Sequence, residues 1–330
     1  MLARSFHRSN QFLQLPRKHK TDICISYNVK RDDKRINWTL HESGRNVHTL
    51  RWNWKSVKEA EAWILLSSDR HHDNKHADQN LEIEHLKEAQ KRGAAIIDIG
   101  DMHCAMQGKY DRRKSTLGLR DEYVCETYLD ALVECAADFY SPYANNFAVI
   151  GQGNHETAIL KHHETDLTER TCERMSAISG VRVCSGGYSG FVRLCFQWHT
   201  QKFERILHYF HGSGGASPMS HGTLNVRRMA SWLPDADIVA TGHTHSTFYV
   251  PISRCRLKKN GDIENDEQHH VNCGTYKDES GDRYGGWSVE KGMPPKPVGA
   301  VWLRIVGYHK AQKYANSTQK QLRFEFIRAV

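Results

Sequence analysis

The pattern of apolar and polar positions predicts alternating strands and helices along most of the chain. Short apolar runs typical of buried strands occur at residues 63–66, 94–99, 147–150, 206–210 and 238–240. Helical periodicity covers residues 78–92, where Gly93 is placed to end the helix, and residues 121–139. Two further strands are expected at 301–306 and 322–327. This alternation predicts an α/β fold.

The residues before the first apolar run have a separate strand pattern. Residues 36–40 and 47–54 alternate as strands do, with a turn between them, so a β-hairpin is expected. Its tryptophans, Trp38, Trp52 and Trp54, lie near arginines and have two interpretations. They are suited to stacking on nucleic-acid bases. The favoured alternative is that they pack the hairpin against the main domain.

These patterns divide the chain into three parts. Residues 1–20 form a basic arm that contains five Arg or Lys residues and no acidic residue. A mitochondrial transit peptide is a less favoured interpretation of this arm. Residues 21–58 form the small β extension, and residues 59–330 form the main domain. Within that domain, an irregular insertion is expected at about 251–300, which includes a Gly/Pro-rich stretch.

Five short segments rich in metal-ligand side chains directly follow the strand-like runs. The candidate ligands in them are Asp69, His71, Asp101, Asn154, His211, His243 and His245. Because residues at successive strand ends gather at one edge of a sheet, a single site is expected. Carboxylate, amide and imidazole groups suit manganese, iron or zinc. Seven ligands are too many for one catalytic ion and fit two ions roughly 3.5–4 Å apart.

In this order the segments resemble the signature motifs of the calcineurin-like metallophosphoesterases. The family's motifs D-x-H, GD, GNHE, H and GHxH match residues 69–71, 100–101, 153–156, 211 and 242–245. The resemblance covers residues from roughly 60 to 276 and ends at a closing strand near Val271. It implies a four-layer α/β sandwich, in which two mixed β-sheets are flanked by helices.

The resemblance also implies a role for each motif residue. Asp69, His71 and His245 would hold the first ion, Asn154, His211 and His243 the second, and Asp101 would bridge them. Metal-bound hydroxide would attack phosphorus, and His155 would assist the leaving group. Glu156 would orient the His155 imidazole. Manganese is the favoured ion, and iron, zinc, nickel and magnesium are alternatives.

Composition and charge favour a protein that acts on an anionic substrate. The formal net charge is +8, which suits nucleic acid among other polyanions. A basic segment, residues 109–114, and Arg120 follow Asp101, and they either hold phosphate oxygens or form a solvated loop. The nine cysteines include no C-x-x-C pair, which favours reduced thiols and a cytoplasmic location. No apolar run approaches the ~18 residues of a membrane span.

The expected function is metal-dependent hydrolysis of a phosphoric ester. A phosphodiesterase or nuclease that acts on DNA, RNA or a nucleotide is favoured over a phosphatase. One alternative is a phosphomonoesterase that acts on a phosphoprotein or a nucleotide. Another is a binding protein that keeps the fold without turnover. The motifs do not separate these possibilities, and they identify no protein partner.

Overall fold

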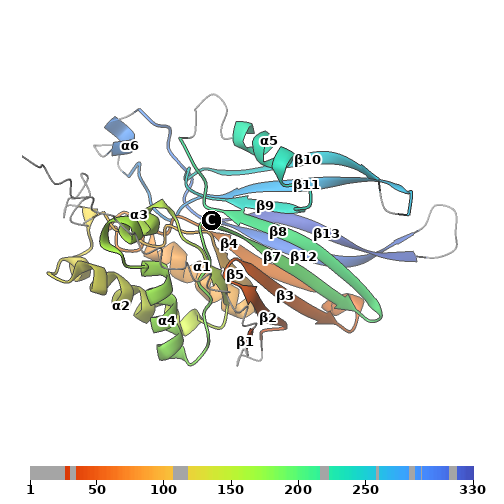
Figure 1. The fold of residues 1–330 in the computed structure, drawn as a ribbon, viewed down its shortest axis with the longest axis horizontal. Helices are drawn as coiled ribbons and strands as arrows, with labels where there is room; N and C mark the ends of the chain where they lie inside the picture. Colours follow the sequence, from red (N-terminus) through yellow and green to blue (C-terminus); the bar gives the residue numbers. More distant parts are fainter. Residues whose placement is uncertain are drawn as a thin grey trace, which may run out of the picture.

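The computed structural model describes residues 27–29, 35–106, 118–215, 223–257, 260–281, 287–290, 292–311 and 318–330. These residues form thirteen strands in two sheets, with helices on the outside (Figure 1). The basic arm at residues 1–20 and the basic segment at 109–114 lie outside the described residues. Arg120 is described, and its guanidinium donates to the carbonyl oxygens of Asn74 and Ala77.

The strands form a larger and a smaller sheet. In spatial order, the eight strands of the larger sheet are β1 (Tyr27–Val29), β2 (Trp38–Gly44), β3 (Val47–Trp54), β7 (Ser189–Trp198), β8 (Gln201–Phe210), β9 (Ile238–Thr241), β11 (Ile263–Cys273) and β10 (Thr247–Leu257). The five strands of the smaller sheet are β13 (Thr318–Ala329), β12 (Ala300–Ala311), β4 (Glu61–Ser67), β5 (Ala95–Asp98) and β6 (Phe147–Ile150).

Both sheets are mixed, and each contains a parallel core. In the smaller sheet, β5 pairs in parallel with β4 and with β6. In the larger sheet, β9 pairs in parallel with β8 and with β11. Parallel neighbours end at the same edge of a sheet, so residues that follow these strands lie close together.

Helices cover the outer faces of both sheets (Figure 1). Six are described: α1 (Gln79–Arg92), α2 (Tyr128–Tyr140), α3 (Asn154–His163), α4 (Leu167–Ser179), α5 (Thr223–Trp232) and α6 (Trp287–Glu290). The prediction that α1 ends at Gly93 is confirmed, since Gly93 is its C-cap with φ 60°. Within the described part of the chain, no helix is long and apolar enough to cross a membrane.

Two main hydrophobic cores define the layers. One lies between the sheets and contains Trp52, Phe196 and Leu303. The other lies between the smaller sheet and helices α1, α2 and α4, and contains Leu86 and Met175. A smaller cluster packs α5 onto the larger sheet. The predicted four-layer α/β sandwich is therefore confirmed.

The predicted N-terminal hairpin is confirmed as β2 and β3. It joins the larger sheet, because β3 pairs in parallel with β7. Trp38, Trp52 and Trp54 are only 2%, 0% and 3% exposed, and the ring of Trp52 stacks on that of Phe196 at 5.0 Å. These tryptophans pack the hairpin into the core, and their burial excludes a role in base stacking.

Two predicted elements differ from the structure. The helix expected from residue 121 begins at Tyr128, because Asp121–Tyr123 form a separate 3-10 turn and Val124 is 56% exposed. The insertion expected to be irregular at 251–300 is regular in its first half. There β10 and β11 pair without interruption from Thr247↔Cys273 to Leu257↔Ile263.

Candidate metal centre

Strand ends from both sheets meet at one place. Three ligand segments follow β4, β5 and β6 of the smaller sheet, and two follow β8 and β9 of the larger sheet. Backbone hydrogen bonds tie neighbouring segments together. The Asp69 N–H donates to the Gly100 carbonyl at 2.9 Å, and the Gly242 N–H donates to the His211 carbonyl at 2.9 Å. The structure thereby brings together all seven side chains predicted as metal ligands.

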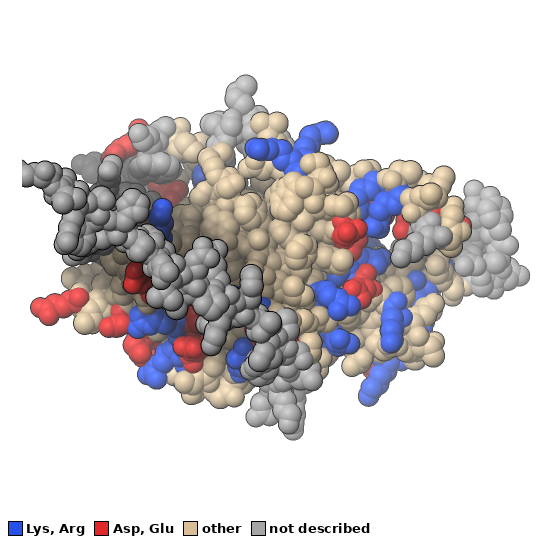
Figure 2. Space-filling model, viewed as in Figure 1, with Lys and Arg blue, Asp and Glu red and all other residues tan. Residues whose placement is uncertain are grey.

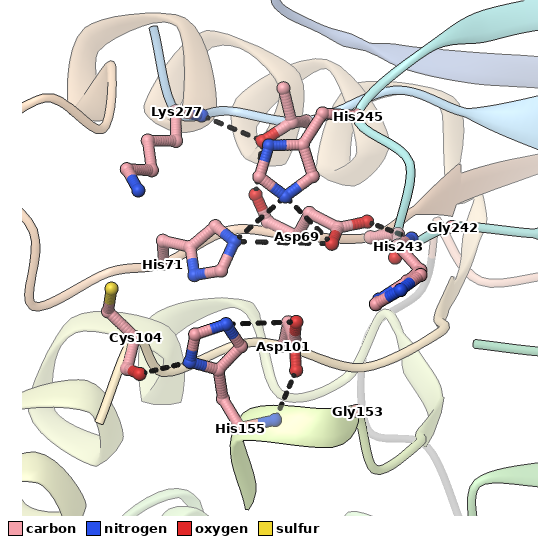
Figure 3. Close-up of polar contacts among 12 residues, drawn as sticks. Asp69, His71, Asp101, Cys104, Gly153, His155, Gly242, His243, His245 and Lys277 are labelled. Atoms are coloured by element: carbon pink, nitrogen blue, oxygen red, sulfur yellow. Dashed lines mark hydrogen bonds and ion pairs between the residues drawn. The ribbon is translucent and has the colours of Figure 1, made fainter. Parts of the chain in front are cut away.

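Asp69, His71 and His245 form the first group of ligand atoms (Figure 3). The Nε2 atoms of His71 and His245 lie 3.2 Å apart, and Asp69 Oδ1 lies 3.2 Å from His245 Nε2. All three residues are buried. Two imidazole nitrogens and a carboxylate oxygen that converge in this way suit one divalent cation.

The second group consists of Asp101, Asn154, His211 and His243. Asp101 Oδ2 lies 3.2 Å and Asn154 Oδ1 lies 3.1 Å from His211 Nε2. His243 Nδ1 lies 2.6 Å from Asn154 Oδ1. This set offers oxygen and nitrogen ligands to a second cation. The bridging role of Asp101 stays a prediction.

Five of the seven candidate ligands have left-handed backbone conformations. Asp69, His71, Asp101, His243 and His245 have φ angles between 47° and 69°, and among the described residues they are five of the eight non-glycine residues at positive φ. Asp and His tolerate this region better than most residues, but each such residue still costs on the order of 1–2 kcal/mol. Strain concentrated on these residues is typical of a functional site.

Two motif glycines allow the ligand segments to approach closely. A Cβ atom on Gly153 would overlap Asp101 at its Oδ1 and backbone N atoms. A Cβ atom on Gly242 would overlap Ser68 Oγ and lie 2.8 Å from Asp69 Oδ2. The glycines of the GNHE and GHTH motifs are therefore required by the distance between neighbouring strand ends.

The charges in the site favour a bound cation. Burial raises the pKa of Asp101, but His155 and His211 outweigh it and hold the pKa well below its usual value. Burial lowers the pKa of His211 and of His245, but Asp101 and Asp69, respectively, outweigh it and raise each pKa to about 9. Without a cation, the carboxylates therefore retain protons on two imidazoles. A bound divalent ion would replace those protons.

His155 lies beside both ligand groups. Its Nδ1 atom donates to the carbonyl oxygen of Cys104, which can only accept. This bond leaves Nε2 directed toward the site, 3.7 Å from Asp101 Oδ2 (Figure 3). The side chain is 10% exposed, whereas that of His211 is fully buried. The position of His155 suits a group that contacts substrate.

The expected role of Glu156 is wrong. Its carboxylate accepts hydrogen bonds from the backbone N–H groups of Asp101 at 3.1 Å, His103 at 2.9 Å and Gly153 at 2.8 Å. Adjacent residues of a helix point in different directions, so Glu156 does not reach the ring of His155. Burial and the Asp101 charge raise the pKa of Glu156 to about 8. Glu156 positions the segment that carries Asp101.

Sequence reasoning missed two charged residues beside the first group, Glu279 and Lys277. Glu279 Oε1 lies 3.3 Å from His245 Nδ1 and 3.4 Å from Lys277 Nζ. The segment that carries them is tied to the site, because the Thr275 hydroxyl donates to the Asp69 carbonyl at 2.8 Å. Lys277 and Glu279 lie four and six residues beyond β11, which ends at Cys273, and they belong to none of the five motifs.

Arg70 anchors the first ligand segment from behind. Its guanidinium lies 2.5 Å from Asp98 Oδ2 and 2.5 Å from Glu82 Oε1, and all three side chains are fully buried. Asp98 also accepts from the Ser67 hydroxyl at 2.8 Å. The ion pairs hold the segment that carries Asp69 and His71 against β5 and α1.

Comparisons with known proteins leave the family of this chain open. No family model matches the chain, and no curated protein matches it. One similar solved structure is a predicted phosphoesterase from Streptococcus pneumoniae TIGR4, with 11% identity, a TM-score of 0.30, and coverage of 80% of this chain and 99% of its own. Another is GAP50, the anchor in the inner membrane complex of Plasmodium, with 11% identity, a TM-score of 0.39, and coverage of 82% and 85%. Function is therefore inferred from the site itself.

Proposed function

We propose that this protein is a phosphoric ester hydrolase that binds two divalent metal ions and cleaves a phosphodiester. The observation that carries the proposal is the convergence of seven oxygen and nitrogen ligands from five strand ends. They form two neighbouring groups, as a pair of metal ions requires. The motif order, which resembles that of the calcineurin-like metallophosphoesterases, supports the same function.

The donor atoms fit hard or borderline ions such as manganese. Asp69 Oδ1, which faces the first ligand group, is buried and has no hydrogen-bond partner among the described residues, so it is available to a cation. Cys104 lies near His71 and His155, but burial raises the pKa of its thiol to about 12. When bound, two divalent ions would supply an activated water and hold the phosphate oxygens.

The residues of the chain then have separate tasks. The Cys104 carbonyl accepts from Nδ1 and fixes the ring of His155, so in the doubly protonated imidazolium Nε2–H would donate to the oxygen that leaves phosphorus. Lys277 places a cation at the edge of the first ligand group, where it can contact a phosphate oxygen. Glu279 Oε1 lies 3.3 Å from His245 Nδ1, and its charge would favour a proton on that atom and leave Nε2 for the cation.

A pair of chromogenic substrates tests the choice of a diester. A phosphate diester and a phosphate monoester with the same leaving group are compared with manganese, and the Asn154→Ala protein is the control. We expect faster turnover of the diester and a strong loss in the variant, because Asn154 contributes an oxygen to the second group. A preference for the monoester would instead identify a phosphatase. Turnover by neither, in protein that contains two metals, would favour a binding protein.

The leaving-group role of His155 has its own test. His155→Ala keeps all seven metal ligands, so metal content is expected to stay at the wild-type level. Its rate should fall most for esters with poor leaving groups, about 10²–10⁴-fold. An equal loss for good and poor leaving groups would contradict proton donation by this residue.

A further inference from the structure

A cavity opens next to the second ligand group, between α5 and the larger sheet. Its volume is about 230 Å³, which is below the ~300–1,000 Å³ typical of pockets for drug-sized ligands. Gly212 and Gly242, which adjoin the candidate ligands His211 and His243, line one wall. One ligand can therefore place its phosphate at the metal centre and another of its groups in this cavity.

The walls of the cavity are mostly apolar and aromatic. Phe210 at the end of β8, Met229 on α5 and Phe248 on β10 contribute apolar surface. Trp232, on the last turn of α5, also lines the cavity and is 57% exposed. Its ring and that of His208 are nearly perpendicular, with centroids 5.8 Å apart. An exposed tryptophan beside an apolar cavity is suited to stacking on a flat ring.

Asn272 supplies a specific polar group to the same cavity. Its amide nitrogen donates to the Gly242 carbonyl at 3.2 Å and contacts Thr244 Oγ1 at 3.1 Å. Since a carbonyl can only accept, this contact fixes which amide atom is nitrogen. The Oδ1 atom is buried and has no hydrogen-bond partner among the described residues. Asn272, which lines the cavity and is 3% exposed, therefore holds an acceptor that no described residue satisfies.

We propose that this cavity binds the base of a nucleoside whose phosphate lies at the metal centre. The inference rests on the proposed function and names its substrate class as a nucleotide ester. Trp232 stacks on the base, and Asn272 accepts from one of its N–H groups. Bases combine a flat apolar face with N–H donors at the edge, which matches both observations.

The lining of the cavity carries little charge. Arg228 is the only Lys, Arg, Asp or Glu among the described residues that line it. Figure 2 shows basic side chains on α5, at the rim of the cavity. A neutral ring therefore suits the lining. The phenyl ring of a tyrosine phosphate has no N–H donor for Asn272.

Two esters that share a leaving group test the proposal. Thymidine 5′-(4-nitrophenyl phosphate) and methyl 4-nitrophenyl phosphate differ only in the arm that stays on phosphorus. We expect the wild-type protein with manganese to favour the nucleoside ester in kcat/KM by about tenfold. In Trp232→Ala this ratio should fall to about one. Leu224→Ala is the matched control, because Leu224 is 65% exposed on the same helix and does not line the cavity.

The possible results distinguish failure of the base-binding proposal from failure of the proposed hydrolase activity. A ratio of one in the wild-type protein, or a ratio that Trp232→Ala leaves unchanged, would overturn base binding. Equal preference for a phenyl ester would also overturn it, since any aromatic ring would then suffice. If neither ester turns over, the proposed function fails and calorimetry with thymidine 5′-monophosphate and methyl phosphate decides. Tighter nucleotide binding that is lost in Trp232→Ala supports the cavity, and equal affinities contradict it.

Discussion

Glu279 provides a sensitive test of the first metal site, because it contacts a predicted ligand without binding the ion itself. Its Oε1 atom lies 3.3 Å from His245 Nδ1, and the side chain is only 14% exposed. Burial raises its pKa, but His245 and Lys277 outweigh this effect and lower the pKa to about 2. Glu279 is therefore a carboxylate at neutral pH, and it increases the basicity of the His245 Nε2 atom.

Removing such a carboxylate typically weakens metal binding by about 10–100-fold. Gln at this position keeps an oxygen that can accept from Nδ1, so we expect about tenfold weaker manganese binding in Glu279→Gln, or about 1.4 kcal/mol. Glu279→Ala removes that acceptor as well, and we expect a loss of nearly a hundredfold. Isothermal titration of manganese into the metal-free protein measures both affinities.

The matched control is Glu61→Gln. Glu61 lies on β4, at the opposite end of the strand that leads to Asp69, and its carboxylate pairs with Arg304 at 2.5 Å. Its removal should leave manganese affinity unchanged. Wild-type affinity in both Glu279 variants, or an equal loss in Glu61→Gln, would show that the carboxylate does not support a metal ligand.

Three further predictions follow from the site. His71→Gly should be about 1 kcal/mol more stable than His71→Ala in chemical unfolding without metal, because glycine relieves the left-handed conformation at φ 47°. Manganese affinity should rise from about pH 6 to pH 8, because His211 and His245 have pKa values of about 9 and release protons on binding; an affinity independent of pH would refute this. Gly153→Ala should abolish binding at the second site, since the added Cβ overlaps Asp101, and an unchanged stoichiometry of two would contradict it.

Because of the same raised pKa values, rising pH lowers the stability of the metal-free protein. The stabilisation from His211 and His245 is fully present below the ordinary histidine pKa of 6.5, and it is lost as the pH rises through about 9. Rising pH therefore weakens the metal-free protein while it strengthens metal binding. The stabilisation provided by manganese should increase with pH, as melting temperatures with and without the ion can show.

Much of the fold and site could be predicted because apolar runs directly precede the ligand segments. The runs before Asp69, Asp101 and Asn154 became β4, β5 and β6, and their parallel pairing placed the ligands at one edge. The two-sheet arrangement required the family resemblance, because a run of apolar residues does not specify which sheet a strand joins. The pairing of β3 with β7 joins residues more than 140 positions apart, and local patterns contain no such information.

Other features depend on contacts that the local pattern does not encode. The apolar period of α2 continues upstream to Val124, although the α-helix begins only at Tyr128. Glu279 became part of the site through its contact with His245, 34 positions earlier in the chain. The role of Glu156 was misjudged because its neighbour His155 was expected to be its partner, whereas it binds the backbone of Asp101 and His103.

The central claim is that two metal ions bind at the ends of these strands. Anomalous diffraction from crystals grown with manganese tests it most directly. We predict two anomalous peaks about 3.5–4 Å apart. One should lie among Asp69, His71 and His245, and the other among Asp101, Asn154, His211 and His243. A single peak, or peaks away from these residues, would contradict a dinuclear centre.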